Sequence, residues 1–312
     1  MDPSALLRIA AIGVGHLGRH HARILSTLDG VRLVAVADAD LERARSVGEP
    51  LGARPVSDAH GLIGDVDAVT VAVPTESHVA VALPFIERGI PVLIEKPLAR
   101  SLGEADRLIG AAAASGSILA VGHTERFNPA VAAARGFVDT PRFIEVHRLG
   151  TFPERSLDID VVFDLMIHDL DIVLSLVEGP VASVEAVGVP VLTGRVDIAN
   201  ARLRFEGGCI ANLTASRISR DRTRKIRIFQ PDAYLSIDYA EQEVEIYRLR
   251  RDGGARPAIE GGKLNVPREE PLRRELADFV SAVRNRRAPL VTGEDGRKAL
   301  ALAERITERM RA

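Results

Sequence analysis

An imidazole and three carboxylates interrupt the otherwise apolar stretch VVFDLMIHDLDIV, which spans Val161–Val173. Charges in an apolar segment are unfavourable unless they are paired or solvated. On an α-helix, four polar residues at positions i, i+4, i+8 and i+11 share an arc of about 80°: Asp160, Asp164, His168 and Asp171. Asp164, one turn before His168, could orient the ring and stabilise an imidazolium, as a general acid or base requires. The spacing therefore predicts a helix that carries part of a catalytic site, with Asp169 off this stripe in a structural role.

Three other interpretations of this helix remain open. His168 could be a core histidine whose carboxylate neighbours stabilise the helix. Asp164 and His168 could bind zinc, since positions i and i+4 share a face, but no third and fourth ligand is evident and we expect no metal. A solvated stripe of charges is disfavoured by the surrounding Val, Leu and Met side chains.

A lysine follows a second apolar run, PVLIEKPLA, which ends a predicted strand in Glu95-Lys96-Pro97. Ligands of open α/β sheets collect beyond the carboxyl ends of the strands, so we expect Lys96 to face the ligand crevice. Pro97 disfavours helical geometry at Lys96. An ammonium group at this place could exchange a proton with a substrate hydroxyl. The alternative is a surface lysine at the end of a strand.

The motif GVGHLG, Gly13–Gly18, leaves the first apolar run and opens the first helical pattern. Its glycines would allow a tight turn, close approach to a pyrophosphate and helix–strand packing, and the helix N-terminus would attract phosphates. Asp38 ends the next apolar run, where a carboxylate can accept the ribose hydroxyls of NAD and repel a 2′-phosphate. We therefore predict NAD as the cofactor, with six contacting residues: Gly13, Gly15, His16, Leu17, Gly18 and Asp38. A turn that serves only packing, with Asp38 capping a helix, is the alternative.

Two kinds of pattern surround these residues. Residues 6–122 alternate between short apolar runs and amphipathic helical patterns, which predicts a doubly wound parallel sheet of Rossmann type. Beyond residue 123 come period-two runs such as VASVEAVGV, which predict antiparallel strands. Arg251–Arg268 is rich in Gly and Pro, and we expect a loop there, before two closing helices. The expected fold class is α/β, with a Rossmann domain at 1–122 and an α+β domain containing a large, mostly antiparallel sheet at 123–312.

The composition excludes several classes of protein. The chain has 41 basic and 43 acidic residues among 312, which gives a net charge of −2. This charge produces no overall positive potential that would attract nucleic acid or a membrane surface. No apolar run has the length needed to span a bilayer. The single cysteine, Cys209, excludes an intrachain disulfide. We expect a cytoplasmic protein that binds neither nucleic acid nor membrane.

Six segments together resemble the Gfo/Idh/MocA family of nicotinamide-dependent sugar and polyol oxidoreductases: GVGHLGRHHARIL, VAVADAD, VAVPTESHVAVA, IEKPLA, GHTERFNPAV and FDLMIHDLDIV. The resemblance covers nearly the whole chain. It implies that Lys96, Asp164 and His168 form the catalytic set and contact the substrate, with Lys96 also near the cofactor. It further implies cofactor or substrate contacts at six positions: Pro74, Thr75, His78 and Glu95 on the cofactor side, and Arg126 and Asn128, which we assign to the substrate. Family members often assemble through the second domain, so we expect a homodimer or homotetramer through the C-terminal sheet.

The substrate is indicated by two further segments, RFNPAV and SRISRDRTRKIRIF, which resemble the branch of this family that oxidises C3 of UDP-N-acetylglucosamine. Between Arg217 and Arg227 lie six cations in eleven residues, enough to meet a diphosphate, and we take Arg217 and Arg222 as candidates. A solvated strand edge is the alternative for this basic run. Two alternative functions remain. The protein could be an inositol or hexose dehydrogenase of the same family, or a non-catalytic NAD-sensing protein on the same fold.

Overall fold

The computed structural model describes residues 5–152, 159–251 and 258–311. Contacts divide the chain into two compact units. The first unit holds Met1–His123 and Leu272–Leu300, and the second holds Thr124–Pro271 and Ala301–Ala312. The division after His123 lies next to the expected boundary. In contrast to the expected domains, however, Leu272–Leu300 join the first unit.

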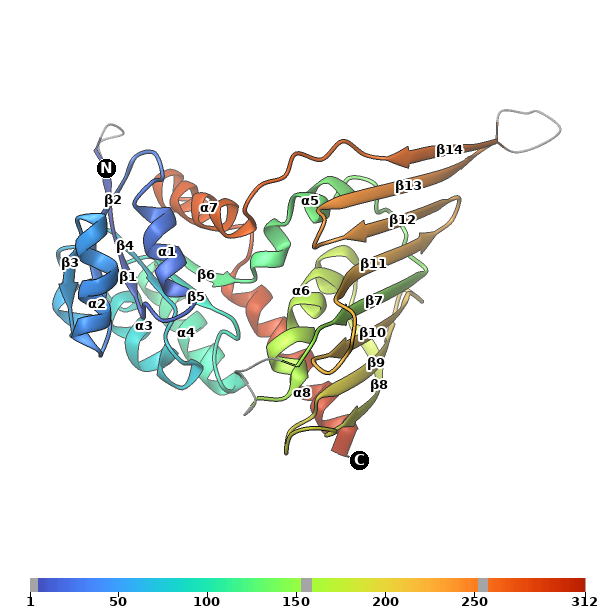
Figure 1. Ribbon diagram of the computed structural model, residues 1–312, viewed down its shortest axis with the longest axis horizontal. Coiled ribbons are helices and arrows are strands. Elements are labelled where there is room, and N and C mark those ends of the chain that lie inside the picture. Colours follow the sequence, from blue (N-terminus) through green and yellow to red (C-terminus); the bar gives the residue numbers. More distant parts are fainter. Residues whose placement is uncertain (1–4, 153–158, 252–257, 312) are drawn as a thin grey trace. The chain divides into compact units, whose positions relative to one another are not determined.

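The first unit is built on a six-stranded sheet in which neighbouring strands are parallel (Figure 1). In spatial order its strands are β3 (Arg54–Val56), β2 (Val31–Ala37), β1 (Leu7–Ile12), β4 (Ala68–Val71), β5 (Val92–Glu95) and β6 (Leu119–Gly122). Its connecting helices include α1 (Gly18–Leu25), α2 (Leu41–Gly48), α3 (His78–Ile86) and α4 (Leu102–Ser115). From β1 the strands are added on one side up to β3, and from β4 they are added on the other side up to β6. Ligands of such sheets bind at the point between β1 and β4 where this order reverses. The predicted Rossmann architecture is confirmed.

The helix α7 (Pro271–Asn285) belongs to the core of the first unit because its apolar face packs there. Leu276 and Phe279 share one buried cluster with Ile9 of β1 and Ile24 of α1. The last helix, α8 (Gly293–Arg311), starts in the first unit and ends in the second. The boundary inferred from the sequence followed chain order, whereas the packing of α7 brings a late segment back to the first sheet.

The second unit contains an eight-stranded sheet, mostly antiparallel as predicted, with β7 and β10 as its parallel pair. In spatial order its strands are β14 (Ala258–Lys263), β13 (Glu243–Arg250), β12 (Ala233–Asp238), β11 (Thr223–Gln230), β7 (Phe143–Leu149), β10 (Ile210–Ser216), β9 (Ile198–Phe205) and β8 (Val181–Val189). Two helices, α5 (Pro129–Arg135) and α6 (Ile167–Leu176), lie against one face of this sheet (Figure 1). Ile144 and Val146 of β7 and Leu170 of α6 belong to the apolar core between them.

Two strands of this sheet, β7 and β14, are not predicted by the sequence patterns. The inward positions of β7 are Ile144, Val146 and then Arg148, a charge where the pattern requires an apolar residue. The loop predicted at Arg251–Arg268 is wrong for Ala258–Lys263, which pairs with β13 as β14. Gly261 permits this pairing, since a Cβ there would lie 1.9 Å from the Ile246 carbonyl oxygen. Residues 252–257 of the predicted loop lie outside the described residues.

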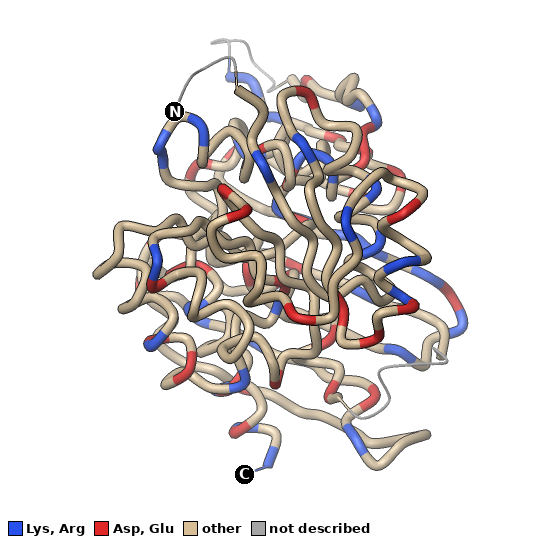
Figure 2. Tube along the Cα trace, turned by 90° about the vertical axis from the view of Figure 1, so that its left-hand side faces the viewer, with Lys and Arg blue, Asp and Glu red and all other residues tan. Residues whose placement is uncertain are grey.

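Basic and acidic positions are intermingled along the chain, as expected from the near-zero net charge (Figure 2). Within the described ranges, no helix combines the length and apolar character needed to cross a membrane.

Candidate active site

In the glycine-rich turn between β1 and α1, two of the three glycines are required because a side chain would clash with the protein itself. Gly13 has a φ of +79°, and a Cβ there would lie 2.6 Å from Val73 Cγ1. A Cβ at Gly18 would lie 1.7 Å from the Gly13 carbonyl oxygen. At Gly15, by contrast, a Cβ would meet no protein atom within 4 Å. The missing side chain at Gly15 therefore leaves open space over the turn, which is what close approach of a pyrophosphate requires.

The N-terminus of α1 follows the glycine-rich turn directly. Its N-cap residue, Leu17, makes no side-chain hydrogen bond to the helix. The Arg19 N–H points to the Gly15 carbonyl oxygen at 3.4 Å, and the His20 N–H donates to the Leu17 carbonyl oxygen at 2.8 Å. The positive end of the helix dipole at this turn can still attract phosphate oxygens. His16 is exposed beside them and Leu17 is half-buried. The turn and helix thus fit the diphosphate of a dinucleotide.

Asp38 directly follows β2 and is fixed in place by the neighbouring backbone. Its Oδ2 accepts the Val14 N–H at 2.9 Å, and its Oδ1 accepts the Asp40 N–H at 3.0 Å. Arg43 of α2 donates from Nη1 to Asp38 Oδ1 at 3.1 Å and from Nη2 to Asp40 Oδ2 at 3.1 Å. The carboxylate therefore stands beside the glycine-rich turn, as expected for a ribose-binding acid. Sequence reasoning missed Arg43, although its i+3 spacing from Asp40 could have indicated the ion pair.

The turn after β4 holds three of the predicted cofactor residues in different surroundings. Pro74 is exposed and Thr75 is half-buried, so both can meet a ligand. His78 is 1% exposed, and its Nδ1 and Nε2 lie 3.2 Å and 3.0 Å from the carbonyl oxygens of Leu98 and Val73. Burial lowers the pKa of His78 below its usual value, against the opposing effect of these carbonyl groups. The ring thus joins the turn after β4 to the segment that follows Lys96, which is a structural contact rather than an exposed one.

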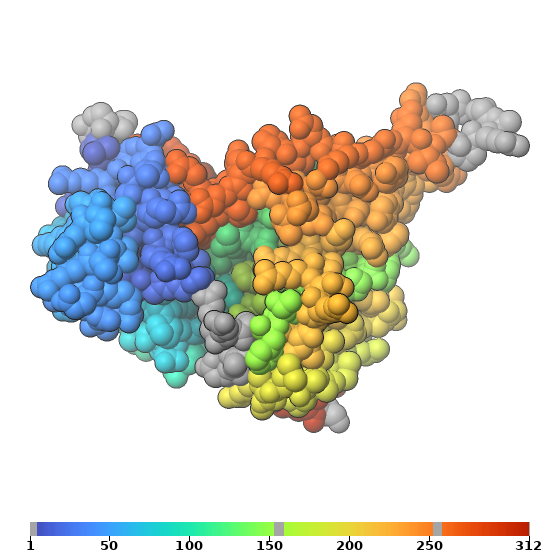
Figure 3. Space-filling view, in the orientation of Figure 1, coloured from blue at the N-terminus to red at the C-terminus, as the bar shows by residue number. Residues whose placement is uncertain are grey.

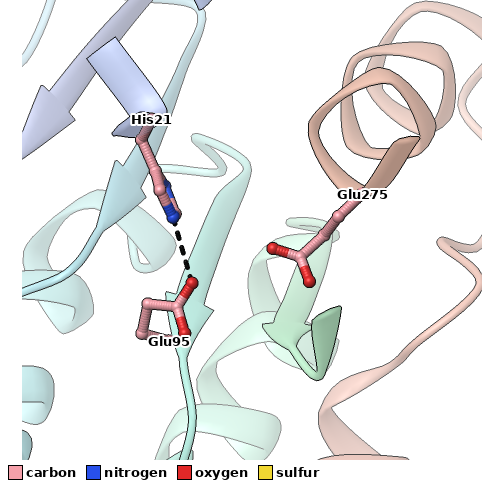
Figure 4. Close-up of side chains that lie close together, drawn as sticks. All are labelled: His21, Glu95 and Glu275. Atoms are coloured by element: carbon pink, nitrogen blue, oxygen red, sulfur yellow. Dashed lines mark hydrogen bonds and ion pairs between the residues drawn. The ribbon is translucent and has the colours of Figure 1, made fainter. Parts of the chain in front are cut away.

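Glu95 and Lys96, at the end of β5, lie in contrasting surroundings. Lys96 is half-buried, whereas Glu95 is 5% exposed and turned into the unit. Glu95 Oε1 lies 3.0 Å from His21 Nε2, and Glu95 Oε2 accepts the Lys96 N–H at 3.3 Å. Glu275 of α7 completes a buried His21–Glu95–Glu275 cluster, in which one side-chain N or O atom of each residue lies within 4.8 Å of the others (Figure 4). Sequence reasoning missed His21 and Glu275, since nothing in the sequence distinguishes them from surface residues of an amphipathic helix.

In the second unit, Asp164 lies on η5 (Val162–Met166) and His168 on α6. The segment η5 is a π-helical turn rather than the regular α-helix that the spacing predicts. Such a turn inserts a residue into the helix and is frequent at functional sites. The 80° arc assumed an unbroken α-helix, and that assumption is wrong at Asp164. Both side chains are half-buried, so both retain access to a ligand.

The remaining carboxylates of the predicted stripe make structural contacts. Asp160 Oδ1 accepts the Val196 N–H at 3.1 Å. Asp171 is 1% exposed and accepts from Arg126 Nε at 2.8 Å and Nη2 at 2.5 Å. The stripe therefore divides into a half-buried centre, Asp164 and His168, and structural ends.

Asp169 has the structural role expected of it. Its carboxylate accepts from Arg148 Nε at 2.6 Å and Nη2 at 2.9 Å, while Arg148 Nη1 donates to Glu125 at 3.0 Å. Burial by itself would lower the pKa of Arg148, but the charges of Asp169 and Glu125 raise it above its usual range. Two bidentate pairs, Arg148–Asp169 and Arg126–Asp171, thus connect α6 to β7 and to η4 (Thr124–Phe127).

The predicted substrate residues Arg126 and Asn128 are buried within the second unit. Arg126 is 7% exposed and is the partner of Asp171. Asn128 is 2% exposed, caps α5 by accepting the Ala130 N–H, and donates to the Tyr239 carbonyl oxygen at 3.0 Å. These contacts favour positioning roles for both residues.

The basic run is largely paired inside the second unit. Arg217 is 2% exposed and donates to Asp197 Oδ1 at 2.9 Å. Arg222 is exposed and lies 3.3 Å from Thr151 Oγ1. Two further cations form ion pairs across neighbouring strands: Lys225 with Asp238 at 3.2 Å and Arg227 with Glu145 at 3.0 Å. The run is thus mostly a solvated face of β11, which lies between β12 and β7 and not at an edge of the sheet. Arg222 is the better placed of the two diphosphate candidates.

Asp197 also organises the turn between β8 and β9. Its Oδ2 accepts the N–H groups of Val191, Leu192 and Thr193 at 2.9, 2.7 and 2.9 Å. Burial would raise its pKa, but these hydrogen bonds hold the pKa of Asp197 well below its usual range.

An open glycine-rich turn, an acid at the end of β2 and a lysine at the end of β5 define a dinucleotide-dependent oxidoreductase. Comparison with known proteins is consistent with this class. Residues 7–123 match the family described as "Oxidoreductase family, NAD-binding Rossmann fold", and residues 131–236 match the "GFO/IDH/MocA C-terminal domain". The chain belongs to the Gfo/Idh/MocA oxidoreductase family, and the prediction of an NAD-binding domain is confirmed.

Individual relatives extend over the whole chain. The chain is 40% identical over 305 residues to a UDP-N-acetylglucosamine 3-dehydrogenase of Acidithiobacillus ferrooxidans, covering 96% of both chains. A solved structure of UDP-N-acetylglucosamine 3-dehydrogenase GnnA from that organism matches with a TM-score of 0.91 and 38% identity, covering 97% of both chains. A myo-inositol 2-dehydrogenase of Thermotoga maritima is 29% identical, covering 95% of this chain and 94% of that protein.

Proposed function

We propose that the protein oxidises the C3 hydroxyl of UDP-N-acetylglucosamine to a ketone, with NAD as the oxidant. The observation that carries this proposal is the 40% identity to a UDP-N-acetylglucosamine 3-dehydrogenase over 96% of the chain. The myo-inositol 2-dehydrogenase matches over a similar length at 29% identity, which makes a free polyol the second candidate substrate.

Each side chain has a defined part in this proposal. NAD, when bound, supplies the hydride acceptor. Gly15 and the first turn of α1 hold its diphosphate, and Asp38 holds the adenosine ribose. Lys96 and His168 contact the reacting carbinol, and one of them accepts the hydroxyl proton. Asp164 orients His168 and balances its charge when the ring is protonated. Arg222 is the candidate contact for the sugar diphosphate.

The direct test follows NADH absorbance after purified protein is mixed with NAD and single sugars. We expect turnover with UDP-N-acetylglucosamine and a product lighter by two hydrogen atoms in mass spectrometry. Turnover with free inositols but not with the nucleotide sugar would contradict the proposed substrate. Tight NAD binding without turnover of any UDP-sugar, inositol or hexose would favour an NAD-sensing protein.

A matched pair of variants tests the catalytic assignment. Lys96→Met removes the ammonium group at similar volume and should lower kcat by more than about 100-fold, within the range of general acid–base catalysis. Lys298→Met, on α8 of the same unit, is the control and should keep wild-type kcat. Full activity of Lys96→Met would remove Lys96 from the mechanism.

For assembly, we propose that two copies pair through the sheet face opposite α5 and α6. Four aromatic rings lie in a row across adjacent strands on that face: Phe143, Phe229, Tyr234 and Tyr247. The distances between successive ring centroids are 5.6, 5.1 and 6.3 Å. Phe229 and Tyr247 are 37% and 40% exposed, and exposed aromatic clusters favour protein–protein contact. Part of the β11–β14 region is visible on the surface in Figure 3.

Analytical ultracentrifugation tests this assembly. We expect a dimer or tetramer for the wild type and dissociation for Phe229→Glu, because a charge would be buried in the interface. Leu290→Glu is the control, since Leu290 is 41% exposed and belongs to the first unit rather than to this sheet. A monomeric wild type, or an unchanged assembly of Phe229→Glu, would contradict the proposal.

A further inference from the structure

We propose that Glu95 is a positioning residue for Lys96, and that His21 holds Glu95 in the orientation this requires. This inference rests on the proposed catalytic role of Lys96. It replaces the cofactor contact predicted for Glu95 with a contact inside the protein.

The carboxylate of Glu95 connects two elements that the reaction needs. Through Oε1 it meets Nε2 of His21 on α1, at 3.0 Å. Through Oε2 it accepts the backbone N–H of Lys96, at 3.3 Å. Figure 4 shows the contact between Glu95 and His21. One side chain thus joins the helix proposed to receive the cofactor diphosphate to the backbone that carries the proposed base.

The space around Glu95 leaves its side chain little freedom. A Cβ on Gly122, at the end of β6, would lie 2.7 Å from the Glu95 carboxyl carbon, so the carboxylate occupies the room that a side chain at 122 would need. Glu95, His21 and Glu275 are 5%, 0% and 1% exposed. A buried and tightly surrounded carboxylate can fix the backbone N–H that it accepts more firmly than water could.

Stability alone is a weak reason for this cluster. Two carboxylates and one imidazole in a dry interior carry a large desolvation penalty, and apolar residues of similar volume are often equally stabilising at such places. A binding site for a metal ion also fits poorly. Two zinc ligands at their usual bond lengths stand about 3.3 Å apart in a tetrahedral site, whereas His21 Nε2 and Glu95 Oε1 are within direct hydrogen-bond distance at 3.0 Å. The contact with the Lys96 N–H is the feature that gives the cluster a function.

The test compares Glu95→Ala, which removes the carboxylate, with Glu95→Gln, which keeps an acceptor oxygen of the same shape. Since a misplacement of about 1 Å can lower a rate by about 100-fold, we expect Glu95→Ala to lower kcat by 10- to 100-fold. The Kd for NADH, from fluorescence titration, and the KM for the sugar should stay within about twofold, and Glu95→Gln should recover most of kcat. Glu104→Gln is the matched control, because Glu104 belongs to the same unit but pairs with the exposed Arg100.

Two results would overturn the proposal. A rise in the NADH Kd that accounts for the whole loss of activity would make Glu95 a cofactor contact. Unchanged kcat in Glu95→Ala would remove any role in positioning. If the wild type has no turnover, the proposed function fails, and hydrogen–deuterium exchange then tests the inference separately. Exchange of the peptide containing Lys96 should increase in Glu95→Ala but not in Glu95→Gln, and equal exchange in all three proteins would contradict the inference.

Discussion

Replacing Asp169 by Asn tests whether buried arginine pairs hold α6 in place. The substitution keeps the shape of the side chain but removes the charge that Arg148 meets at 2.6 and 2.9 Å. The two side chains are 5% and 1% exposed, so water cannot replace the lost partner. Removing one partner of a buried pair destabilises by about 3–5 kcal/mol. We expect the lower end, about 3 kcal/mol, because Arg148 Nη1 keeps its contact with Glu125 at 3.0 Å.

Thermal unfolding followed by circular dichroism measures this effect. For a unit of this size, each kcal/mol shifts Tm by about 2–4 °C, so Asp169→Asn should lower Tm by roughly 6–12 °C. The control is Glu42→Gln, which breaks an ion pair with Arg45 whose side chains are 79% and 49% exposed. Exposed pairs contribute about 0–1 kcal/mol, so its Tm should change by no more than about 2–4 °C.

The reasoning would be refuted if Asp169→Asn and the Glu42→Gln control gave the same small shift. A double variant, Arg148→Met with Asp169→Leu, separates the charge from the packing. Because apolar replacements of a whole buried pair are often neutral or stabilising, the double variant should recover much of the lost Tm. A double variant as unstable as Asp169→Asn would show that the shape of the pair, rather than its charge balance, is what matters.

Three further predictions concern single residues. Because the pKa of Asp197 is lowered in the folded state, the stabilisation that its carboxylate provides should be complete above the unfolded pKa of about 3.9 and be lost as pH falls below it. The difference in unfolding free energy between wild type and Asp197→Asn, measured by urea unfolding, should therefore shrink from pH 6 to pH 3. A constant difference would contradict this assignment. Gly15→Ala should leave Tm unchanged, since a Cβ there meets no protein atom within 4 Å, but should weaken NADH binding about tenfold or more in a fluorescence titration. Burial raises the pKa of the Cys209 thiol to about 11, so a thiol reagent at pH 8 should label it only after unfolding, and rapid labelling of the native protein would be inconsistent with this burial.

The fold was predictable wherever each residue of an element follows one pattern. The buried strands β4, β5 and β6 consist almost wholly of small and branched apolar residues, as strands covered on both faces must. Prediction failed where a buried charge replaces an apolar residue. In β7 the inward Arg148 breaks the alternation, and its partner Asp169 lies 21 residues further along the chain. A single sequence does not reveal such a pair, because neither residue is apolar and their spacing fits no regular element.

The candidate site was predictable in its residue types and less so in its geometry. The glycine-rich turn and Asp38 follow local rules of strand, turn and helix, and they lie as expected. The π-helical turn at Asp164 depends on packing in the second unit and has no local signal. The burial of Glu95 depends on His21 and Glu275, which come from distant segments. Local pattern therefore identifies the residues near the chemistry, while tertiary contacts decide which of them face the ligand.

The return of α7 to the first unit has a consequence for the order of events during synthesis. Leu276 and Phe279 cover Ile9 and Ile24, yet they leave the ribosome after the whole second sheet has been made. The nascent nucleotide-binding sheet therefore carries an uncovered apolar surface until α7 has been made. A chain cut short before residue 271 would expose that surface, and exposed apolar surface of this kind favours aggregation and recognition by chaperones. The first sheet thus depends for its cover on a helix that is made after the whole second sheet.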